Sequence, residues 1–269
     1  MRFYLFLVSI FFILAGQANE LPEWKTFDIQ NNLYTLREEE ISTGIDFDQA
    51  NKRLLDSINS YSPDLALGRA PGISFEQARQ LLQEADRDNN ELTSQSKFEK
   101  SNVLGLCFGR SIFFHLMLLR YGVNKDSIKK IFVIGPMSGT GDVQWQFHTA
   151  TIVKDTTSGR WWALDTTFSE PLSVDEWIRQ MKRRSQDTTF RIFRENLVDK
   201  TKSLRFYITQ PEKIGPSGWK YNIKLGGLFD PFYNGYFKDI FELIKKKNIS
   251  PIQKFNYGLK NKCDVLFSD

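Results

Sequence analysis

The sequence predicts a folded protein that combines helices and strands, with a mainly helical region first and a mixed region after about residue 98. Apolar residues at helical spacing mark the segments before that point. After it comes a helix that is apolar on nearly every side, which is typical of a buried central helix. Short β-rich runs on either side of a polar turn follow, and they predict an antiparallel hairpin.

The composition is that of a folded soluble chain. The protein has 269 residues, of which 41% are hydrophobic and 25% are charged, and these fractions exclude a collagen-like or wholly disordered chain. Lys and Arg number 36 against 32 Asp and Glu, a net charge of +4, which is too small an excess to predict nucleic-acid binding. With only two cysteines and two histidines, any chemistry that uses these residue types has few candidates.

The first residues predict a cleaved signal peptide, residues 1–18. Arg2 precedes an apolar run over residues 3–15, and Gly16 and Ala18 are small residues at the positions that a signal peptidase reads. The run is shorter than the roughly 20 residues that a spanning helix needs. We therefore expect cleavage near Ala18, export to the periplasm or the medium, and no stable membrane insertion.

The region over residues 19–97 is expected to be mainly helical. One helix is predicted over residues 46–59 from apolar spacing, and a second over residues 74–85, where Ser74 and Gln77 fit a capping box. Residues 68–72 are rich in Gly and Pro and predict an exposed loop between the two.

Residues 86–97 are polar and predict a linker, which places a domain boundary at about residue 98. Asp86 and Asp88 imitate the opening of a calcium loop, but Glu91 stands where that loop requires Gly, and Lys97 where it requires Glu. No metal or other cofactor is therefore expected.

The second region, residues 98–269, is expected to carry the chemistry. Its predicted elements are a buried helix over residues 108–121 closed by Gly122, a strand over 131–134 stopped by Gly135 and Pro136, hairpin strands over 147–153 and 161–164, a helix over 175–184, a strand over 206–208 and a late apolar-faced helix that ends at Lys245–Lys247.

Cys107 opens the buried helix, directly after Gly105 and Leu106. Unpaired backbone N–H groups and the positive end of the helix dipole favour a thiolate at such a position, and the same N–H groups can hold an oxyanion. This placement is typical of a nucleophile. The competing interpretation is a structural disulfide between Cys107 and Cys263, which export would permit.

A thiol nucleophile needs a base, and the chain offers two histidines. His115 is eight residues further along the same helix as Cys107, so it rises roughly 12 Å above the sulfur and cannot reach it. His148, at the start of the first hairpin strand, is therefore the predicted base.

The hairpin predicts the residue that orients this base. If the turn is residues 155–158, Lys154 opposes Gly159 and His148 falls directly opposite Asp165. Paired residues share a face, with Cβ atoms about 4.5–5.5 Å apart, so the carboxylate would fix the tautomer of the imidazole. The predicted site is thus Cys107, His148 and Asp165, whereas the competing interpretation makes Asp165 an ordinary turn residue.

This order, with Cys at a helix start, His at a strand start and Asp at the end of the next strand, resembles the transglutaminase-like and papain-like cysteine hydrolases. Within them, the segments over residues 107–110 (CFGR), 147–153 (FHTATIV) and 162–165 (WALD) most resemble the secreted bacterial protein-glutaminases. Transglutaminases often carry an aromatic residue two positions after the His, where this chain has Ala150. The resemblance covers roughly residues 100–180.

The resemblance implies an α+β fold in which the Cys-bearing helix packs on an antiparallel sheet. It implies deamidation of glutamine side chains in a protein or peptide substrate, by acyl transfer through a thioester on Cys107. It further implies an inhibitory pro-segment in cis, for which residues 19–97 are the candidate. The oxyanion would be held by the Cys107 N–H with a second donor, for which the candidates are Asn102, Gln144 and Trp145. The candidate walls of a substrate slot are Trp145, Trp161 and Trp162.

Three alternatives stay open at this point. A cysteine peptidase or a transglutaminase would use the same three residues on other amides or with an amine as acceptor. The non-enzymatic alternative is an exported binding protein with a Cys107–Cys263 disulfide.

Overall fold

The computed structural model describes residues 29–87, 107–138, 144–186, 204–209 and 242–247. Its helices are α1 (Ile29–Ser42), α2 (Phe47–Ser60), α3 (Phe75–Arg87), α6 (Cys107–Arg120) and α7 (Val174–Gln186), with a 3-10 turn η1 at Lys125–Ser127. Its strands are β1 (Ile128–Ser138), β2 (Gln144–Lys154), β3 (Trp161–Leu164), β4 (Leu172–Ser173) and β5 (Arg205–Thr209). A short helical stretch over residues 242–246 is also described.

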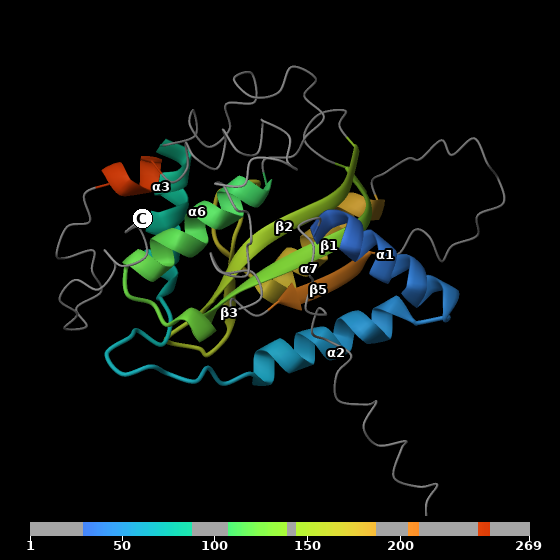
Figure 1. Ribbon diagram of the computed structural model, residues 1–269, viewed down its shortest axis with the longest axis horizontal. Helices are drawn as coiled ribbons and strands as arrows, with labels where there is room; N and C mark the ends of the chain where they lie inside the picture. The colour runs from blue at the N-terminus through green and yellow to red at the C-terminus, as the bar shows by residue number, and fades with distance from the viewer. Residues whose placement is uncertain (1–28, 88–106, 139–143, 187–203, 210–241, 248–269) are drawn as a thin grey trace, which may run out of the picture.

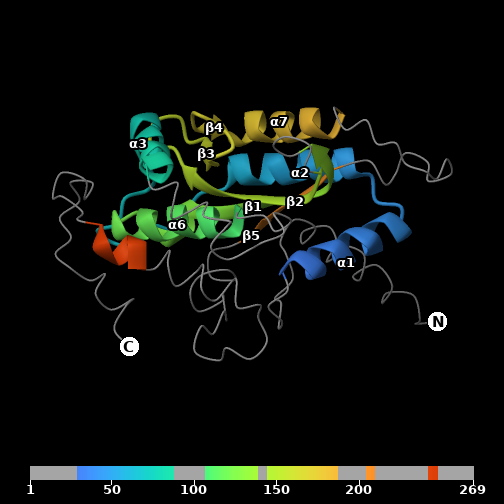
Figure 2. The same cartoon turned by 90° about the horizontal axis from the view of Figure 1, so that it is seen from above.

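The strands form one antiparallel sheet in the order β4-β3-β2-β1-β5 (Figure 1). Figure 2 shows helices on both sides of it, with α6 and α1 on one side and α2 and α7 on the other. The expected α+β fold class is confirmed at this level, including the Cys-bearing helix packed on an antiparallel sheet. The long strands β1 and β2 form the centre of the sheet and position the residues discussed below.

Two hydrophobic clusters hold the layers together, one on each face of the sheet. The α6 side is built mainly from α3, α6 and alternate residues of the central strands, including Phe113, Phe114, Met117, Phe132 and Ile134. The α7 side includes Leu54, Ile58, Val133, Ile152, Trp161, Trp177 and Phe206. The alternation along β1 and β2 follows from the two-residue period of a strand.

Several local predictions are confirmed. Asp46 caps α2 by accepting hydrogen bonds from the backbone N–H groups of Asp48 and Gln49 at 2.9 and 3.1 Å. The predicted capping box at the start of α3 is present: the Gln77 side chain accepts from the Ser74 N–H at 2.8 Å, and Ser74 Oγ accepts from the Gln77 N–H at 3.3 Å.

The Gly135-Pro136 pair does not end the strand as the sequence suggested. β1 runs on to Ser138, and its pairing with β2 shifts register between Ile134 and Met137. Gly135 adopts a φ of 132°, which residues with a side chain rarely adopt, and Pro136 falls where the ladder is interrupted, so its missing N–H costs little. The pair therefore forms an irregularity inside a long strand, next to the residues of β2 that precede His148.

The loop predicted to be exposed over residues 68–72 is only partly so. Ala70 and Ile73 are fully buried and form bridges to Val123 and Asp155. A Cβ on Gly72 would lie 2.1 Å from the Lys154 carbonyl oxygen, so only glycine fits against the end of β2. This connection is consequently part of the packed structure at its C-terminal end.

The N-terminal helices contribute to the same clusters as the sheet. Leu33 of α1 and Leu81 of α3 lie in the cluster on the α6 side, and Leu54 and Ile58 of α2 lie in the other. The indole N–H of Trp161 donates to the Ile58 carbonyl at 2.8 Å. The described part of the region expected to be a separate unit, residues 29–87, therefore packs directly on the sheet. The role of residues 19–97 as an inhibitory pro-segment stays a prediction.

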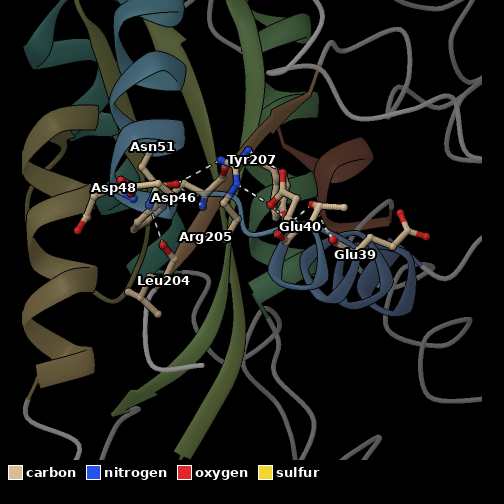
Figure 3. Close-up of polar contacts among 10 residues, drawn as sticks. Glu39, Glu40, Asp46, Asp48, Asn51, Leu204, Arg205 and Tyr207 are labelled. Carbon is tan, nitrogen blue, oxygen red and sulfur yellow. Dashed lines mark hydrogen bonds and ion pairs between the residues drawn. The ribbon is translucent and has the colours of Figure 1, made fainter. Parts of the chain in front are cut away.

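A buried polar network ties α1 and α2 to the edge strand β5 (Figure 3). Arg205, with 2% of its side chain exposed, pairs with Glu40 through Nε–Oε2 at 2.8 Å and Nη2–Oε1 at 3.0 Å. Tyr207 donates to the same carboxylate at 2.8 Å. The amide of Asn51 accepts from the Phe206 N–H at 3.0 Å and donates at 2.7 Å to the carbonyl of Leu204, the residue just before β5. Asn51 thus satisfies backbone groups at the start of the free edge, as a further strand would.

Some predictions fall on residues outside the described part of the chain: the signal peptide at 1–18, Asn102, most of the late helix, and Cys263. In the ranges that are described, no helix is both long and apolar enough for a membrane span.

Candidate functional site

Cys107 is the first residue of α6, as the sequence predicted for a nucleophile. Its side chain is nearly buried, with 6% exposed, and its thiol is free. The first N–H groups of a helix have no intrahelical acceptor, so the backbone here presents donors beside the sulfur. Cys107 therefore lies where helix geometry can serve both a thiolate and an oxyanion.

The hairpin places His148 and Asp165 together, although in a different register from the expected one. Lys154 pairs with Trp161 rather than Gly159, because the Asp155 carboxylate captures the N–H groups of Thr157 and Ser158 and builds a longer turn. The slip is two residues, which preserves the face of every side chain. The β2–β3 ladder ends before His148, and the contact is made from just beyond the end of β3.

Asp165 is held by hydrogen bonds on both of its oxygens. Oδ1 accepts from the Thr167 N–H at 3.0 Å and the Thr167 hydroxyl at 2.9 Å. Oδ2 is 2.7 Å from His148 Nε2 and 2.7 Å from the indole nitrogen of Trp177. Asp165 therefore does both things that the sequence left as alternatives: Oδ1 stabilises the turn, and Oδ2 binds the imidazole.

The His148 ring lies nearly parallel to two indole rings. It stacks on Trp145 with ring centroids 4.9 Å apart and planes at 14°, and on Trp177 with centroids 6.1 Å apart and planes at 19°. Indole faces attract cations, so the stacked Trp145 ring favours a protonated imidazole. Because only 2% of His148 is exposed, its orientation is set by these rings and by Asp165 rather than by solvent.

The electrostatics of the pair favour an imidazolium beside a carboxylate. Burial lowers the pKa of His148, but the charge of Asp165 and its hydrogen bond, with smaller contributions from Cys107, outweigh burial and raise that pKa to about 9. Burial raises the pKa of Asp165, but the His148 charge and the hydrogen bonds from His148, Trp177 and Thr167 outweigh it, so that pKa lies well below its usual range.

The Cys107 thiol reaches the same imidazole. A side-chain hydrogen bond and a charge interaction with Cys107 both favour protonated His148. Since Nε2 is taken by Asp165, Nδ1 is the nitrogen left for the sulfur. The arrangement joins a thiol, an imidazole and a carboxylate in series, which is the arrangement of an activated nucleophile.

His115 does not join this arrangement. It is buried, its Nδ1 has no hydrogen-bond partner in the described part of the chain, and burial followed by the charge of Lys130 holds its pKa well below the usual value. Lys130 is buried too, and donates to Ser111 Oγ at 2.8 Å and to Thr151 Oγ1 at 2.6 Å. These contacts link α6, one turn after Cys107, to the strand that carries His148.

The three tryptophans expected to wall a slot have different positions. Trp145 is partly exposed and lies on the His148 ring, so it is available to a substrate. Trp161 is fully buried under α2, which makes the expectation for this residue wrong. Trp162 packs on Phe75 with ring centroids 5.3 Å apart and pairs with Val153, five residues along β2 from His148, so it does not wall the site either.

Of the expected oxyanion donors, the Cys107 N–H lies at the helix start, while Asn102 is outside the described residues. Gln144 lies in β2 opposite Ser138, four residues before His148.

Sequence reasoning missed Trp177, which donates to Asp165 from α7. Its sequence neighbourhood carries no sign of this role beyond an aromatic residue in a predicted helix. No group of three or more His, Cys, Asp or Glu side chains suited to a metal ion occurs among the described residues.

Comparison with solved structures finds two distant likenesses. The NMR structure of protein-glutaminase from Chryseobacterium proteolyticum is 18% identical, with a TM-score of 0.35, and the match covers 54% of this chain and 75% of that one. A crystal structure of protein-glutaminase is 19% identical, with a TM-score of 0.30, and the match covers 43% of this chain and 65% of that one. No protein-family model and no curated protein sequence matches the chain.

Proposed function

We propose that this protein is a cysteine-dependent amidohydrolase that converts glutamine side chains of proteins or peptides to glutamate and ammonia. Cys107 is the nucleophile, His148 the acid and base, and Asp165 the residue that orients the imidazole. The observation that carries the proposal is the position of His148, bonded to Asp165 through Nε2 at 2.7 Å and interacting with the Cys107 thiol at the start of α6.

The acylation half of the reaction uses the imidazolium. The Cys107 thiolate attacks the carboxamide carbon, and the N–H groups at the start of α6 hold the oxygen that becomes negative. His148 gives its Nδ1 proton to the departing nitrogen, so that ammonia leaves and a thioester forms. The raised pKa of His148, about 9, keeps this proton in place at neutral pH.

The deacylation half uses the imidazole that remains. Neutral His148 takes a proton from water, the resulting hydroxide attacks the thioester, and the Cys107 thiolate leaves as glutamate is released. In both halves of the reaction, the Nε2–H of His148 donates to Asp165 and keeps its proton. Nδ1 is therefore free to donate a proton during acylation and to accept one during deacylation.

Cys107, His148 and Asp165 could attack several kinds of amide. Sequence resemblance supports a glutamine side chain as the substrate. The segments over residues 107–110, 147–153 and 162–165 resemble the protein-glutaminases. At the position where transglutaminases often carry an aromatic ring, this chain has Ala150, which is buried in the cluster on the α7 side of the sheet. The apolar N-terminal run supports the further proposal that the enzyme acts after export, once residues 1–18 are removed.

The test is ammonia release from a glutamine-rich protein, with the wild type and with Cys107→Ala and His148→Ala. We expect ammonia from the wild type alone, matched mole for mole by glutamate in the product. New N-termini would instead indicate a peptidase, and incorporation of an added amine would indicate a transglutaminase. Thiol titration of the folded protein addresses the non-enzymatic alternative, since a Cys107–Cys263 disulfide leaves no titratable thiol. Activity retained by either variant would contradict the assigned residues.

A further inference from the structure

Arg184, in the last turn of α7, lies beside the candidate site and has no part in the chemistry described so far. Its guanidinium carbon is 5.4 Å from the ring centroid of Trp145 and 5.5 Å from that of Phe168. Arg184, Trp145 and Phe168 are all partly exposed. Two aromatic rings, Trp145 and Phe168, therefore hold the Arg184 cation at the surface, and Trp145 also stacks on His148.

The surroundings of Arg184 leave its charge unneutralised within the described part of the chain. Its guanidinium donates a hydrogen bond to the Ser138 carbonyl at 3.3 Å, and no carboxylate of the described residues lies within ion-pair distance. Two other basic residues of α7, Arg179 and Lys182, pair with Glu176 and Asp48. Arg184 is thus both held in place and chemically unsatisfied.

A guanidinium in this situation is suited to binding a carboxylate. Contacts with aromatic faces leave the in-plane N–H donors unused, and those not directed at the Ser138 carbonyl match the two oxygens of a carboxylate. Because the side chain is already immobilised, less conformational entropy is lost when a ligand binds. A phosphate would satisfy the same donors, but side chains of an ordinary protein substrate offer carboxylates.

The distance to the imidazole sets where such a carboxylate would lie in the substrate. The guanidinium carbon is 5.4 Å from the Trp145 centroid and that centroid is 4.9 Å from the His148 centroid, so the cation and the imidazole are within about 10 Å of each other. An extended chain advances about 3.3–3.6 Å per residue. This span corresponds to about three residues on either side of the reacting glutamine.

We propose that Arg184 is a specificity-determining residue that selects glutamines with an acidic residue within about three positions, by binding the carboxylate against Trp145 and Phe168. The inference rests on the proposed function, because it describes the substrate of the same site. It adds a substrate class, glutamine in an acidic sequence context, which the Cys107, His148 and Asp165 geometry alone does not provide.

The test compares peptides that carry one glutamine with Glu, Ala or Lys at each of the three positions on either side. For the wild type we expect kcat/KM to be about tenfold higher for the best Glu peptide than for its Ala counterpart, the size of one charge-assisted contact. Arg184→Gln should abolish this preference, and Arg184→Glu should reverse it in favour of Lys. The wild-type preference should also shrink as ionic strength rises.

The matched control is Arg183→Gln, which removes the same charge from the exposed neighbouring position and should keep the preference. Arg184→Lys keeps the charge and is used if Arg184→Gln folds poorly. It should keep part of the preference for Glu peptides. Equal kcat/KM for Glu and Ala peptides in the wild type would overturn the inference. So would a preference that persists in Arg184→Gln, because Arg184 would then only cover Trp145.

A binding arm separates this inference from the proposed function. Calorimetric titration of the Cys107→Ala protein with the same peptides measures recognition without turnover. If no peptide is deamidated by the wild type, the proposed function fails, yet tighter binding of Glu peptides that depends on Arg184 would still support the inference. Equal binding of the Glu and Ala peptides to the Cys107→Ala protein would refute it whatever the turnover.

Discussion

Asp165→Asn is the substitution that most directly separates an orienting carboxylate from a turn residue. The wild-type carboxylate accepts four hydrogen bonds, from His148 Nε2, the Trp177 indole, and the N–H and hydroxyl of Thr167. An amide offers one acceptor oxygen in place of two. In one orientation its NH₂ group faces the Thr167 N–H, and in the other it faces the Trp177 indole and His148. One buried donor loses its partner in either case, at a cost of about 1–3 kcal/mol.

The loss of charge has the larger effect on chemistry. The pKa of His148 is raised from 6.5 to about 9 with Asp165 as the first cause of the rise, and a shift of that size corresponds to about 3 kcal/mol in favour of the imidazolium. Without the carboxylate, burial dominates and the imidazole is mostly neutral at pH 7.5. We expect turnover to fall by a factor of about 10²–10⁴, as when a similar carboxylate is neutralised in serine proteases. The KM should change little, since Asp165 does not contact the substrate.

The pH dependence gives the sharpest assay. Wild-type turnover should decline as pH rises through about 9, because the protonated His148 that supplies the leaving group with a proton is lost there. In Asp165→Asn this alkaline limb should move down by more than two pH units, because the pKa of His148 then falls back to or below its ordinary value of about 6.5. Steady-state rates and thiol alkylation across pH 5–10 on both proteins measure it. Asp175→Asn, which makes the same charge change in the first turn of α7, is the control. Superimposable profiles for wild type and Asp165→Asn would refute the orienting role.

The same pKa values predict the pH dependence of stability. His148 has a raised pKa in the folded state, so its contribution is complete below the unfolded value of about 6.5 and is lost as pH rises through 9. Asp165 has a lowered pKa, so its contribution is complete above about 4 and is lost as pH falls. Thermal melts should therefore place the maximum contribution of this pair between about pH 4 and 6.5, and Asp165→Asn should flatten the curve.

The remaining predictions concern residues around the site and the N-terminal helices. Trp177→Phe keeps an aromatic ring but removes a donor to the orienting carboxylate, so kcat should fall about tenfold at constant KM, and an unchanged kcat would contradict its positioning role. His115→Gln should lose stability rather than turnover; a stable but inactive variant would mean that His115, and not His148, is the base. Glu40→Gln leaves Arg205 buried without its partner and should lower the free energy of unfolding by about 3 kcal/mol, whereas the exposed neighbour Glu39→Gln should not. Denaturant unfolding of the Glu40 and Glu39 variants checks this, and equal stabilities would show that the network does not hold the N-terminal helices.

Elements with strong local signals were predictable. The Asp46 cap, the Ser74–Gln77 capping box and the buried α6 all follow from short-range physical chemistry, and the structure has each of them. Helix α1 was not predicted, because its apolar residues are irregularly spaced. The buried contacts of its Glu40 are with Arg205 and Tyr207, which are 165 and 167 residues away.

The part of the candidate site that depends on the two-residue alternation of strands was predictable. His148 and Asp165 share a face in any register that differs by an even number of residues, so the two-residue error in the turn did not separate them. Trp177 could not be found in the same way, because its bond to Asp165 depends on how α7 packs across the sheet. The burial of Trp161 likewise depends on α2, a helix 100 residues earlier in the chain.

If Cys107 attacks a glutamine side chain, it forms a thioester, and this intermediate can be trapped. Wild-type protein is mixed with a glutamine peptide, quenched in acid within the first turnover, digested and examined by mass spectrometry. We expect an adduct on Cys107 equal to the peptide mass less one ammonia, absent from Cys107→Ala and discharged by hydroxylamine. Ammonia release by Cys107→Ala, or an adduct on any other residue, would contradict this role of Cys107.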